Sequence, residues 1–352
     1  MEHERQVPHL HHGTKQVQAH PLRRPRRLRR SEVIRRLACE TRLAPDQLVL
    51  PQFLVNGENK SEPISAMPGR ARLSIDRAIE ECAEAMARGV RAFALFPAVD
   101  PSKKTPEARE AVNPENLNCR AVRAIKRELP GACVITDVAL DPYSSLGHDG
   151  LVSRDGVVLN DETVEVLSEM AVLHARAGAD IVAPSDMMDA RVGAVRRALD
   201  DAGYSDVAVL SYTAKYASAF YGPFREALDS APAEADNVPK DKKTYQMNPA
   251  NSREAVVEAL LDEEEGADML MVKPALPYLD IIARLRSTSN LPIAAYHVSG
   301  EYAMIKAAAQ NGWLDERACM SEALQAIARA GADIIITYAA LDYATWWYEA
   351  LT

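Results

Sequence analysis

The sequence predicts an α/β fold built on a parallel sheet, and three observations support this expectation. Apolar, β-branched-rich runs of about four to nine residues alternate with Ala-, Glu- and Arg-rich stretches of helical character. Several helical stretches end in Gly just before the next apolar run, and the junctions ARGVRAF, ARAGADIV, EEGADML and ARAGADII are near copies of one another. Eight such units in about 300 residues favour a closed (β/α)8 TIM barrel with an extended N-terminal arm.

The apolar runs are the expected barrel strands, because buried parallel strands read as short apolar segments between helices. In chain order they are Leu48–Val55, Arg91–Val99, Cys133–Leu140, Asp180–Pro184, Val207–Tyr212, Met269–Val272, Pro292–Val298 and Asp333–Tyr338. Helices are expected between them, for example at residues 74–89, 162–178 and 321–331. A doubly wound open sheet is the alternative, but no GxGxxG turn follows the first strand.

The composition is that of an ordinary soluble globular protein with one large core. Of the 352 residues, 47% are hydrophobic and 26% are charged, and no apolar run approaches the roughly 20 residues that span a bilayer. The first 30 residues lack the apolar segment of a secretory signal. The five cysteines (Cys39, Cys82, Cys119, Cys133 and Cys319) are scattered singly, so we expect neither a disulfide framework nor a thiolate metal cluster, and a cytoplasmic location.

Charge divides the chain into a basic arm, residues 1–42, and an acidic barrel, residues 43–352. The arm has eleven Lys and Arg against four Asp and Glu, a net charge of +7, so the remainder carries −16 of the total of −9. We expect the arm to lie on an acidic neighbouring subunit, and its first 20 or so residues could be disordered. A disordered tail and a nucleic-acid patch at HPLRRPRRLRR are the alternatives, and the HxHH at 9–12 is interpreted as incidental.

Polar residues gather where the predicted strands end, which is where barrels of this kind carry their chemistry. They are Asp137, Ser185, Asp186, Lys215, Lys273, His297, Ser299, Glu301, Thr337 and Tyr338. A single strand-end lysine could be a snorkelling surface residue, but Lys215 and Lys273 follow adjacent strands. Each ammonium disfavours protonation of the other, and burial acts in the same direction, so the pair titrates as a coupled system. A neutral amine attacks carbonyl carbon, which points to Schiff-base chemistry.

Five longer motifs carry a resemblance to a known family: MVKPALPYLDII, SYTAKYASAFYGPFREA, KTYQMNPAN, HVSGEYAMIKAA and DVALDPYSSLGHDG. From about residue 22 to the C-terminus the chain resembles the porphobilinogen synthase, or 5-aminolevulinate dehydratase, family. The resemblance implies a lyase that condenses two 5-aminolevulinate molecules to porphobilinogen with loss of two waters, in tetrapyrrole (heme) biosynthesis. It also implies a (β/α)8 barrel with an N-terminal arm, assembled as a homo-octamer.

The resemblance assigns site residues by motif. Lys273 in MVKP is expected to form the Schiff base with the substrate that supplies the propionate side chain, and Lys215 in YTAK with the substrate that supplies the acetate side. The expected carboxylate contacts are Ser299 and Tyr338 for the first substrate, and Arg225, Lys242 and Gln246 for the second. Lys242 stands where the family often has arginine, and Lys243 could share its role. Core packing for Tyr338 and a turn position for Ser299 are the alternatives.

The expected metal use follows the aspartate-rich, non-zinc branch of the family. Where the zinc branch has three cysteines, this chain has Ala139, Asp141 and Asp149, and carboxylates suit Mg²⁺ better than zinc. Asp137, Asp141, Asp149 and Ser185 are expected to support the active site, without an organic cofactor. Glu258 matches a position linked to an allosteric Mg²⁺ at a subunit interface, with a solvated helix-surface glutamate as the alternative.

A long connection, FREALDSAPAEADNVPKDKKTYQ at 224–246, follows the fifth strand and looks longer than the family's usual lid. We expect an active-site lid at about residues 220–246, which on closing would exclude water that hydrolyses imines. A class I aldolase is the alternative enzyme, but it needs only one Schiff-base lysine. A nucleic-acid-binding module using RRPRRLRR is the non-enzyme alternative, disfavoured by the acidic body. No nucleic-acid or membrane partner is therefore expected.

Overall fold

The computed structural model describes residues 23–350, and the chain divides into two compact units, Met1–Glu40 and Thr41–Thr352. In the first unit, a short 3-10 helix at Pro25–Arg29 precedes α1 (Glu32–Leu37). The hydroxyl of Ser31 caps α1 by accepting a hydrogen bond from the Ile34 amide. The HxHH at 9–12 and the order of the first 20 residues lie outside the described residues.

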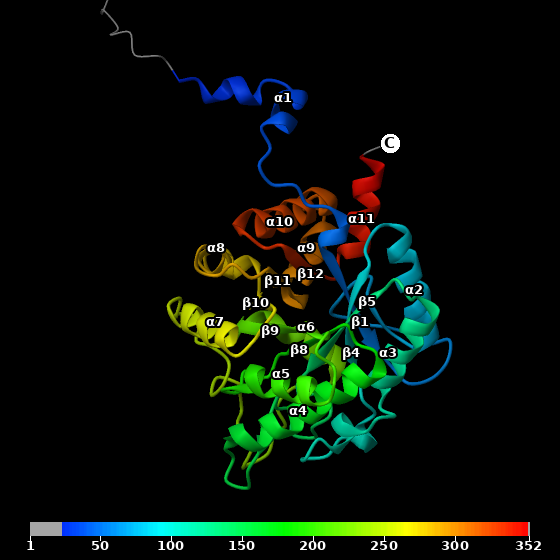
Figure 1. The fold of residues 1–352 in the computed structure, drawn as a ribbon. Coiled ribbons are helices and arrows are strands. Elements are labelled where there is room, and N and C mark those ends of the chain that lie inside the picture. The colour runs from blue at the N-terminus through cyan, green and yellow to red at the C-terminus, as the bar shows by residue number, and fades with distance from the viewer. Residues whose placement is uncertain (1–22, 351–352) are drawn as a thin grey trace, which may run out of the picture. The chain divides into compact units, whose positions relative to one another are not determined.

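Within the described residues of the second unit, eight parallel strands close into a barrel, which confirms the predicted fold class (Figure 1). In sheet order they are β1 (Leu48–Leu54), β4 (Ala92–Pro97), β5 (Cys133–Val138), β8 (Ile181–Pro184), β9 (Ala208–Lys215), β10 (Met269–Lys273), β11 (Ile293–His297) and β12 (Ile334–Thr337). The last strand pairs with the first, with Leu48 opposite Ile335.

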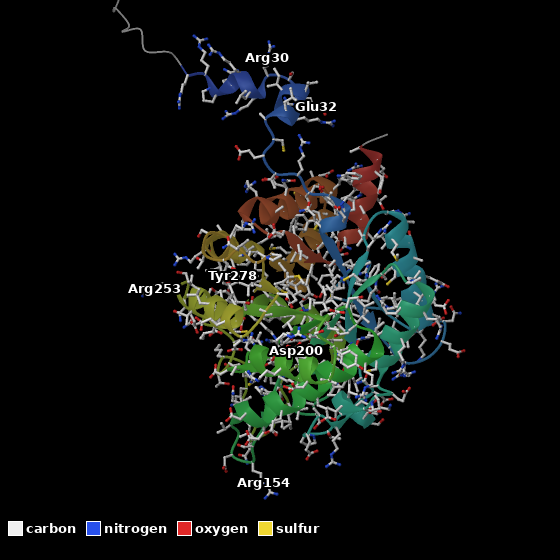
Figure 2. All side chains as sticks on the ribbon, in the orientation of Figure 1. Arg30, Glu32, Arg154, Asp200, Arg253 and Tyr278 are labelled. Carbon is white, nitrogen blue, oxygen red and sulfur yellow. The ribbon has the colours of Figure 1, made fainter. Side chains whose placement is uncertain are left out.

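Helices cover the outside of this barrel (Figure 1). They are α2 (Ile75–Ala87), α3 (Leu117–Glu128), α4 (Asn160–Ala177), α5 (Arg191–Asp201), α6 (Gly222–Leu228), α7 (Glu254–Glu264), α8 (Leu279–Thr288), α9 (Ser299–Gln310), α10 (Glu316–Ala330) and α11 (Ala340–Glu349). All seven residues of β1 and the last seven of β9 are buried, as expected for strands packed on both faces. Charged side chains such as Arg154 and Arg253 extend away from the barrel (Figure 2).

Glycine ends the helices at the repeated junctions seen in the sequence. Gly178 follows α4 with a φ of +107°, and Gly331 follows α10 with a φ of +121°. A side chain is disfavoured at such angles, so glycine allows each helix to stop and the chain to enter the next strand. The near-identical sequences ARAGADIV and ARAGADII therefore encode the same local turn twice.

Each predicted strand is present, with boundaries shifted by a few residues. The fifth strand continues past Tyr212 to Lys215, and the sixth ends on Lys273, so both lysines are the last residues of neighbouring strands. They also face each other in register across the sheet. The sequence did not predict the antiparallel pairs β2 (Ser61–Pro63) with β3 (Ala71–Leu73) and β6 (Leu151–Val152) with β7 (Val158–Leu159), because strands of two or three residues have no periodic pattern.

Among residues 23–350, no helix is long and apolar enough to cross a membrane. The five cysteines are all free thiols, of which Cys82 and Cys119 are buried. Burial raises the pKa of the Cys119 thiol to about 11, so this thiol is protonated at neutral pH. Cys82 and Cys119 therefore contribute to core packing.

Candidate active site

A small cavity at the carboxyl ends of the strands collects most of the predicted site residues. Its volume is about 20 Å³, and charged and polar side chains line it together with two aromatic rings. The lining residues are Asp137, Asp141, Asp149, Ser185, Lys215, Tyr221, Phe224, Arg225, Lys242, Gln246 and Lys273. Nine of the predicted site residues thus meet in one place, from the ends of β5, β8, β9 and β10 and from the lid.

Lys273 ends β10 with its amine in an aromatic enclosure. Its Nζ lies 4.6 Å from the ring centroid of Tyr296, 5.0 Å from those of Tyr212 and Phe224, and 5.3 Å from that of Tyr221. Within residues 23–350 it has no carboxylate partner and no hydrogen bond. Aromatic faces attract an ammonium group, but loss of hydration outweighs this: burial first, and Lys215 second, lower the pKa of Lys273 to about 7.

Lys215 ends the neighbouring strand β9 in a charged environment. Its Nζ lies 3.1 Å from Asp149 Oδ2 and also donates a short hydrogen bond to the backbone carbonyl of Ser185. The other oxygen of the same carboxylate, Asp149 Oδ1, accepts a hydrogen bond of 2.8 Å from Lys242. Although burial opposes it, the two lysines hold the pKa of Asp149 well below its usual range. Asp149 is therefore an anion shared by two ammonium groups.

The lid lysines have separate environments. Lys242 is 5% exposed and also lies 3.4 Å from Asp141, whereas Lys243 is exposed and pairs with Asp241 at 2.9 Å. Burial alone would lower the pKa of Lys242, but Asp141 and Asp149 hold it above the ordinary lysine value. Only Lys242 therefore belongs to the cavity, and Lys243 does not share its place.

Three other cavity residues have polar atoms suited to a ligand. The Oδ1 atom of Asp137 and the Oε1 atom of Gln246 are buried with no hydrogen-bond partner in the described residues. Burial raises the pKa of Asp137 to about 6, despite the two lysines nearby. Arg225 on α6 has no ion pair within residues 23–350, and its guanidinium lies 5.9 Å from the Tyr221 ring. Buried polar groups are normally hydrogen-bonded, so these acceptors and the Arg225 guanidinium are available to bind polar groups of a ligand.

Ser299 and Tyr338 do not line the cavity but touch residues that surround it. The hydroxyl of Ser299 accepts a hydrogen bond of 3.0 Å from the Phe224 amide and lies 3.4 Å from the Phe220 carbonyl. The hydroxyl of Tyr338 bonds that of Tyr296 at 2.8 Å, and its ring stacks on Phe53. In this state both hydroxyls hold neighbouring parts of the site together.

The remaining strand-end residues serve the structure of the rim. His297 is buried and bonds Thr337 through Nδ1 at 3.0 Å. Asp186 accepts a hydrogen bond of 2.7 Å from the Met188 amide. Glu301 accepts hydrogen bonds from three backbone amides, including that of Ala275, two residues after Lys273. These side chains lie at the predicted rim, but they fix loops and do not face the cavity.

The expected lid region contains α6 and then an irregular segment that continues to α7. Its packing against the loop after β5 is close: a side chain at Gly147 would clash with the Ala231 carbonyl, and the Ala233 amide bonds the Leu146 carbonyl at 3.0 Å. His148 bonds the Pro239 carbonyl at 2.8 Å and the Tyr245 hydroxyl at 3.0 Å. These contacts hold the lid against the loop that carries Asp141 and Asp149.

The aromatic enclosure of Lys273 was missed in the sequence. Tyr212 and Tyr296 lie in strands that read simply as apolar runs, while Tyr221 and Phe224 lie in a motif valued only for its lysine and arginine. A signal was present, because a tyrosine inside a buried strand needs a polar partner for its hydroxyl. That signal indicates burial near polar groups but does not identify the lysine.

The carboxylates at the cavity do not fit a zinc ion. Ala139 offers no donor, and Asp141 and Asp149 already share the Lys242 ammonium. In residues 23–350 no group of three or more His, Cys, Asp and Glu is placed to ligate a metal. A tight zinc site takes three or four donors, commonly thiolate or imidazole, and the donors at this cavity fall short of that set.

Glu258 lies away from this cavity, on α7, in a cleft of about 510 Å³ that Asp189 and Glu254 also line. Burial, together with the charges of Asp262, Asp189 and Glu254, raises the pKa of Glu258 to about 7, although Arg191 opposes the shift. The positive charge of Arg191 is therefore too little to offset burial and the neighbouring acidic residues, which disfavour the ionised form of Glu258.

Comparison with known proteins identifies the relatives of this chain. The delta-aminolevulinic acid dehydratase family model matches residues 22–346. A chloroplastic delta-aminolevulinic acid dehydratase of Selaginella martensii is 56% identical over 330 residues, which is 93% of this chain and 78% of that protein. The enzyme of Bradyrhizobium diazoefficiens is 55% identical over 315 residues, 90% of this chain and 88% of that protein.

A solved structure agrees with this result. The delta-aminolevulinic acid dehydratase (porphobilinogen synthase) of Toxoplasma gondii, in complex with the reaction product porphobilinogen, superposes with a TM-score of 0.91 at 51% sequence identity. The match covers 94% of this chain and 93% of that chain. The barrel and the family resemblance seen in the sequence are thus both confirmed.

The prediction of a cytoplasmic location is wrong. Similar proteins of Physcomitrium patens, Chlamydomonas reinhardtii and Glycine max are chloroplastic, at 55%, 53% and 55% identity, while the Bradyrhizobium diazoefficiens protein is bacterial. The prediction rested on scattered free cysteines. Cysteine usage distinguishes oxidising from reducing compartments, but it does not distinguish one reducing compartment from another.

Proposed function

The chain belongs to the delta-aminolevulinic acid dehydratase family and is a lyase with porphobilinogen synthase activity, and from this premise we propose that Lys273 and Lys215 form its two imines. The reaction joins two 5-aminolevulinate molecules into porphobilinogen with loss of two waters, in tetrapyrrole (heme) biosynthesis. The family match supports this activity over the class I aldolase and nucleic-acid alternatives.

One observation carries the assignment of Lys273 as the primary nucleophile. Its amine is buried among four aromatic rings with no carboxylate partner in residues 23–350, and its pKa is about 7. A large fraction of this amine is therefore neutral near pH 7. The neutral amine attacks the substrate ketone carbon, and loss of the ketone oxygen as water leaves a protonated imine. Asp137, with a pKa of about 6, is suited to accept and return protons in these steps.

The two substrate carboxylates are assigned to two sets of residues. For the first substrate we assign Ser299 and Tyr338, whose hydroxyls lie beside the enclosure of Lys273. For the second we assign Arg225, Lys242 and Gln246, which line the cavity on its lid side. The unpaired guanidinium of Arg225 supports this assignment, because it offers a forked donor to a carboxylate.

The test is an incubation of the full chain with 5-aminolevulinate, with and without EDTA, followed by measurement of porphobilinogen. Borohydride added with substrate should attach one substrate mass to the peptide that contains Lys273. We expect product in both incubations and the adduct on that peptide. Labelling of another lysine instead, with product still formed, would reject the assignment of Lys273 while leaving the activity intact.

A regulatory Mg²⁺ site is proposed at the cleft beside Glu258. Mg²⁺ keeps several waters and binds proteins through one or two carboxylates, which suits Glu258 with Asp189 or Glu254. A divalent cation there would offset the burial and the like-charge repulsion that together raise the pKa of Glu258. Mg²⁺ should stimulate the metal-stripped wild type without zinc and should not stimulate Glu258→Gln. Equal stimulation of both proteins would place the regulatory ion elsewhere.

The basic arm is proposed to act in assembly of a homo-octamer. Its net charge of +7 against −16 for the rest of the chain supports contact with a neighbouring subunit. Removal of residues 1–30 should give smaller oligomers in light scattering, and added salt should weaken exposed arm contacts in the full chain. An unchanged assembly after truncation would count against this role.

A further inference from the structure

Lys242 occupies space that a second substrate molecule needs. The cavity of about 20 Å³ has room for about one water molecule, far less than 5-aminolevulinate needs. The ammonium of Lys242 lies inside it against two carboxylates, 2.8 Å from Asp149 and 3.4 Å from Asp141. 5-Aminolevulinate carries an ammonium, a ketone and a carboxylate, so it cannot enter while this side chain stays in place.

Lys242 is better able to move than the two strand-end lysines. Lys215 and Lys273 are fixed at the ends of two paired strands. Asp149 is held by Lys215 and by its own backbone, whose carbonyl accepts a hydrogen bond of 3.1 Å from the Leu140 amide. Lys242 instead sits in the irregular part of the lid, between α6 and α7, on a flexible four-carbon stem. Lid opening would therefore carry its ammonium away from the aspartates.

We infer that Lys242 is a resident counter-cation for Asp149 and Asp141, and that the second substrate molecule enters by exchanging ion pairs with it. The substrate ammonium replaces the Lys242 ammonium at the two carboxylates. The substrate carboxylate then pairs with Lys242 and with Arg225, whose guanidinium has no partner in residues 23–350 of the free protein. This inference rests on the proposed function, which supplies the substrate.

The exchange keeps the charges of Asp141, Asp149 and Lys242 paired before and after binding. A buried charge that loses its partner is strongly destabilising, so a ligand with only one of the two charges is penalised. A ligand without the ammonium would take Lys242 and leave Asp141 and Asp149 without their second cation. The resident pair therefore selects a zwitterion, and it also places an ammonium where a divalent cation would otherwise bind the two carboxylates.

The test uses the metal-stripped full chain and Mn²⁺ as the probe, measured by equilibrium dialysis at neutral pH. Lys242→Met removes the ammonium, so this variant should bind one more Mn²⁺ per chain than the wild type, at Asp141 and Asp149. Added 5-aminolevulinate should release this extra Mn²⁺. Lys243→Met removes a charge from the exposed neighbouring position and should bind as the wild type does. Lys242→Arg keeps a cation at the site and should also match the wild type. Mn²⁺ held near Glu258 is common to all four proteins and cancels.

Equal Mn²⁺ binding by the wild type and a folded Lys242→Met, judged by circular dichroism and assembly size, would overturn the inference. A second measurement uses the wild type alone. Its first substrate site is filled by reducing the Lys273 imine with borohydride, and ligands for the second site are then titrated by calorimetry. Levulinate, which lacks the ammonium, should bind about tenfold or more weakly than 5-aminolevulinate, as expected for loss of a charged hydrogen bond. Equal affinities would also overturn the exchange. Porphobilinogen formation in the same wild-type preparation separates failure of the exchange from failure of the proposed function.

Discussion

Lys273 and Lys215 are neighbours in the barrel sheet, yet their surroundings differ in kind. They end adjacent strands and face each other in register. The amine of Lys273 lies among the rings of Tyr212, Tyr221, Phe224 and Tyr296, whereas that of Lys215 lies 3.1 Å from Asp149. The aromatic side removes water without supplying a negative charge, and the carboxylate side supplies one.

This difference shows how one residue type can take two roles within a single cavity. An enclosure of rings favours the neutral amine, which is the nucleophile for a ketone. A carboxylate beside an ammonium favours the charge and orients it. The assignment of Lys273 as the first nucleophile therefore rests on what surrounds each lysine, since the two side chains are chemically identical.

The largest expected effect comes from removing either amine. Lys273→Ala should lower porphobilinogen formation by roughly a thousandfold or more, because no other group can form the first imine. Lys215→Ala should lower turnover to a similar extent, but borohydride should still attach substrate to Lys273. Porphobilinogen assay together with peptide mass measurement checks both. Substantial turnover in Lys273→Ala would remove the distinction between the two lysines.

A smaller effect is expected from the carboxylate side alone. Asp149→Asn keeps the shape of the side chain and removes the charge shared by Lys215 and Lys242. Loss of a hydrogen bond to a charged group costs about 1.5–3 kcal/mol, which is roughly a 10- to 150-fold fall in kcat/KM. Substrate trapping at Lys273 should persist. If trapping is lost as well, the two environments act as one unit.

The pH dependence should separate the two environments further. The pKa of Lys273 lies below the ordinary lysine value, at about 7, so the neutral amine increases as pH rises through 7 and is lost below it. The rate of imine formation should therefore fall about tenfold per pH unit below 7 and level off above it. Lys215→Met removes a neighbouring positive charge that lowers the pKa of Lys273, so this profile should shift to higher pH in the variant. Rapid-mixing measurement of imine formation checks the shift. A profile that stays in place would mean that burial alone sets the pKa.

The smallest effect is expected from the edge of the aromatic enclosure. Tyr296→Phe keeps the ring 4.6 Å from Lys273 and removes only the hydroxyl that bonds Tyr338. One neutral hydrogen bond contributes about 1 kcal/mol, so KM for 5-aminolevulinate should rise about fivefold while the pH profile remains unchanged. A shifted profile would instead show that the hydroxyl, and not the ring, controls the Lys273 amine.

The lysines could be predicted from the sequence because a cation directly after an apolar run is unusual. Lys273 follows Met269–Val272 without a spacer, and this pattern alone predicts its position at a strand end. The position of Lys215 was harder to predict, because its strand was expected to stop at Tyr212. The strand continues to Lys215, and Thr213 and Ala214 are buried as well. Periodicity and strand order thus placed Lys273 at its strand end, and Lys215 a few residues beyond the predicted one.

The partners of these lysines could not be predicted in the same way. Tyr212 and Tyr296 belong to β9 and β11, and their meeting at Lys273 depends on the curvature of the closed barrel. The pairing of Lys242 with Asp149 depends on how the lid packs against the loop after β5. Composition indicated only that the lid carries cations. Long-range packing of irregular segments leaves no periodic trace in a sequence.

The closure of the barrel has a consequence for how the chain is made. β1 is buried along its whole length and pairs with β12 through Leu48 and Ile335. During synthesis the first strand leaves the ribosome long before its closing partner exists. Until then one edge of an apolar strand presents unpaired backbone groups, the surface on which growing chains associate with one another. Nascent chains of this protein therefore need protection until nearly the last strand has been synthesised.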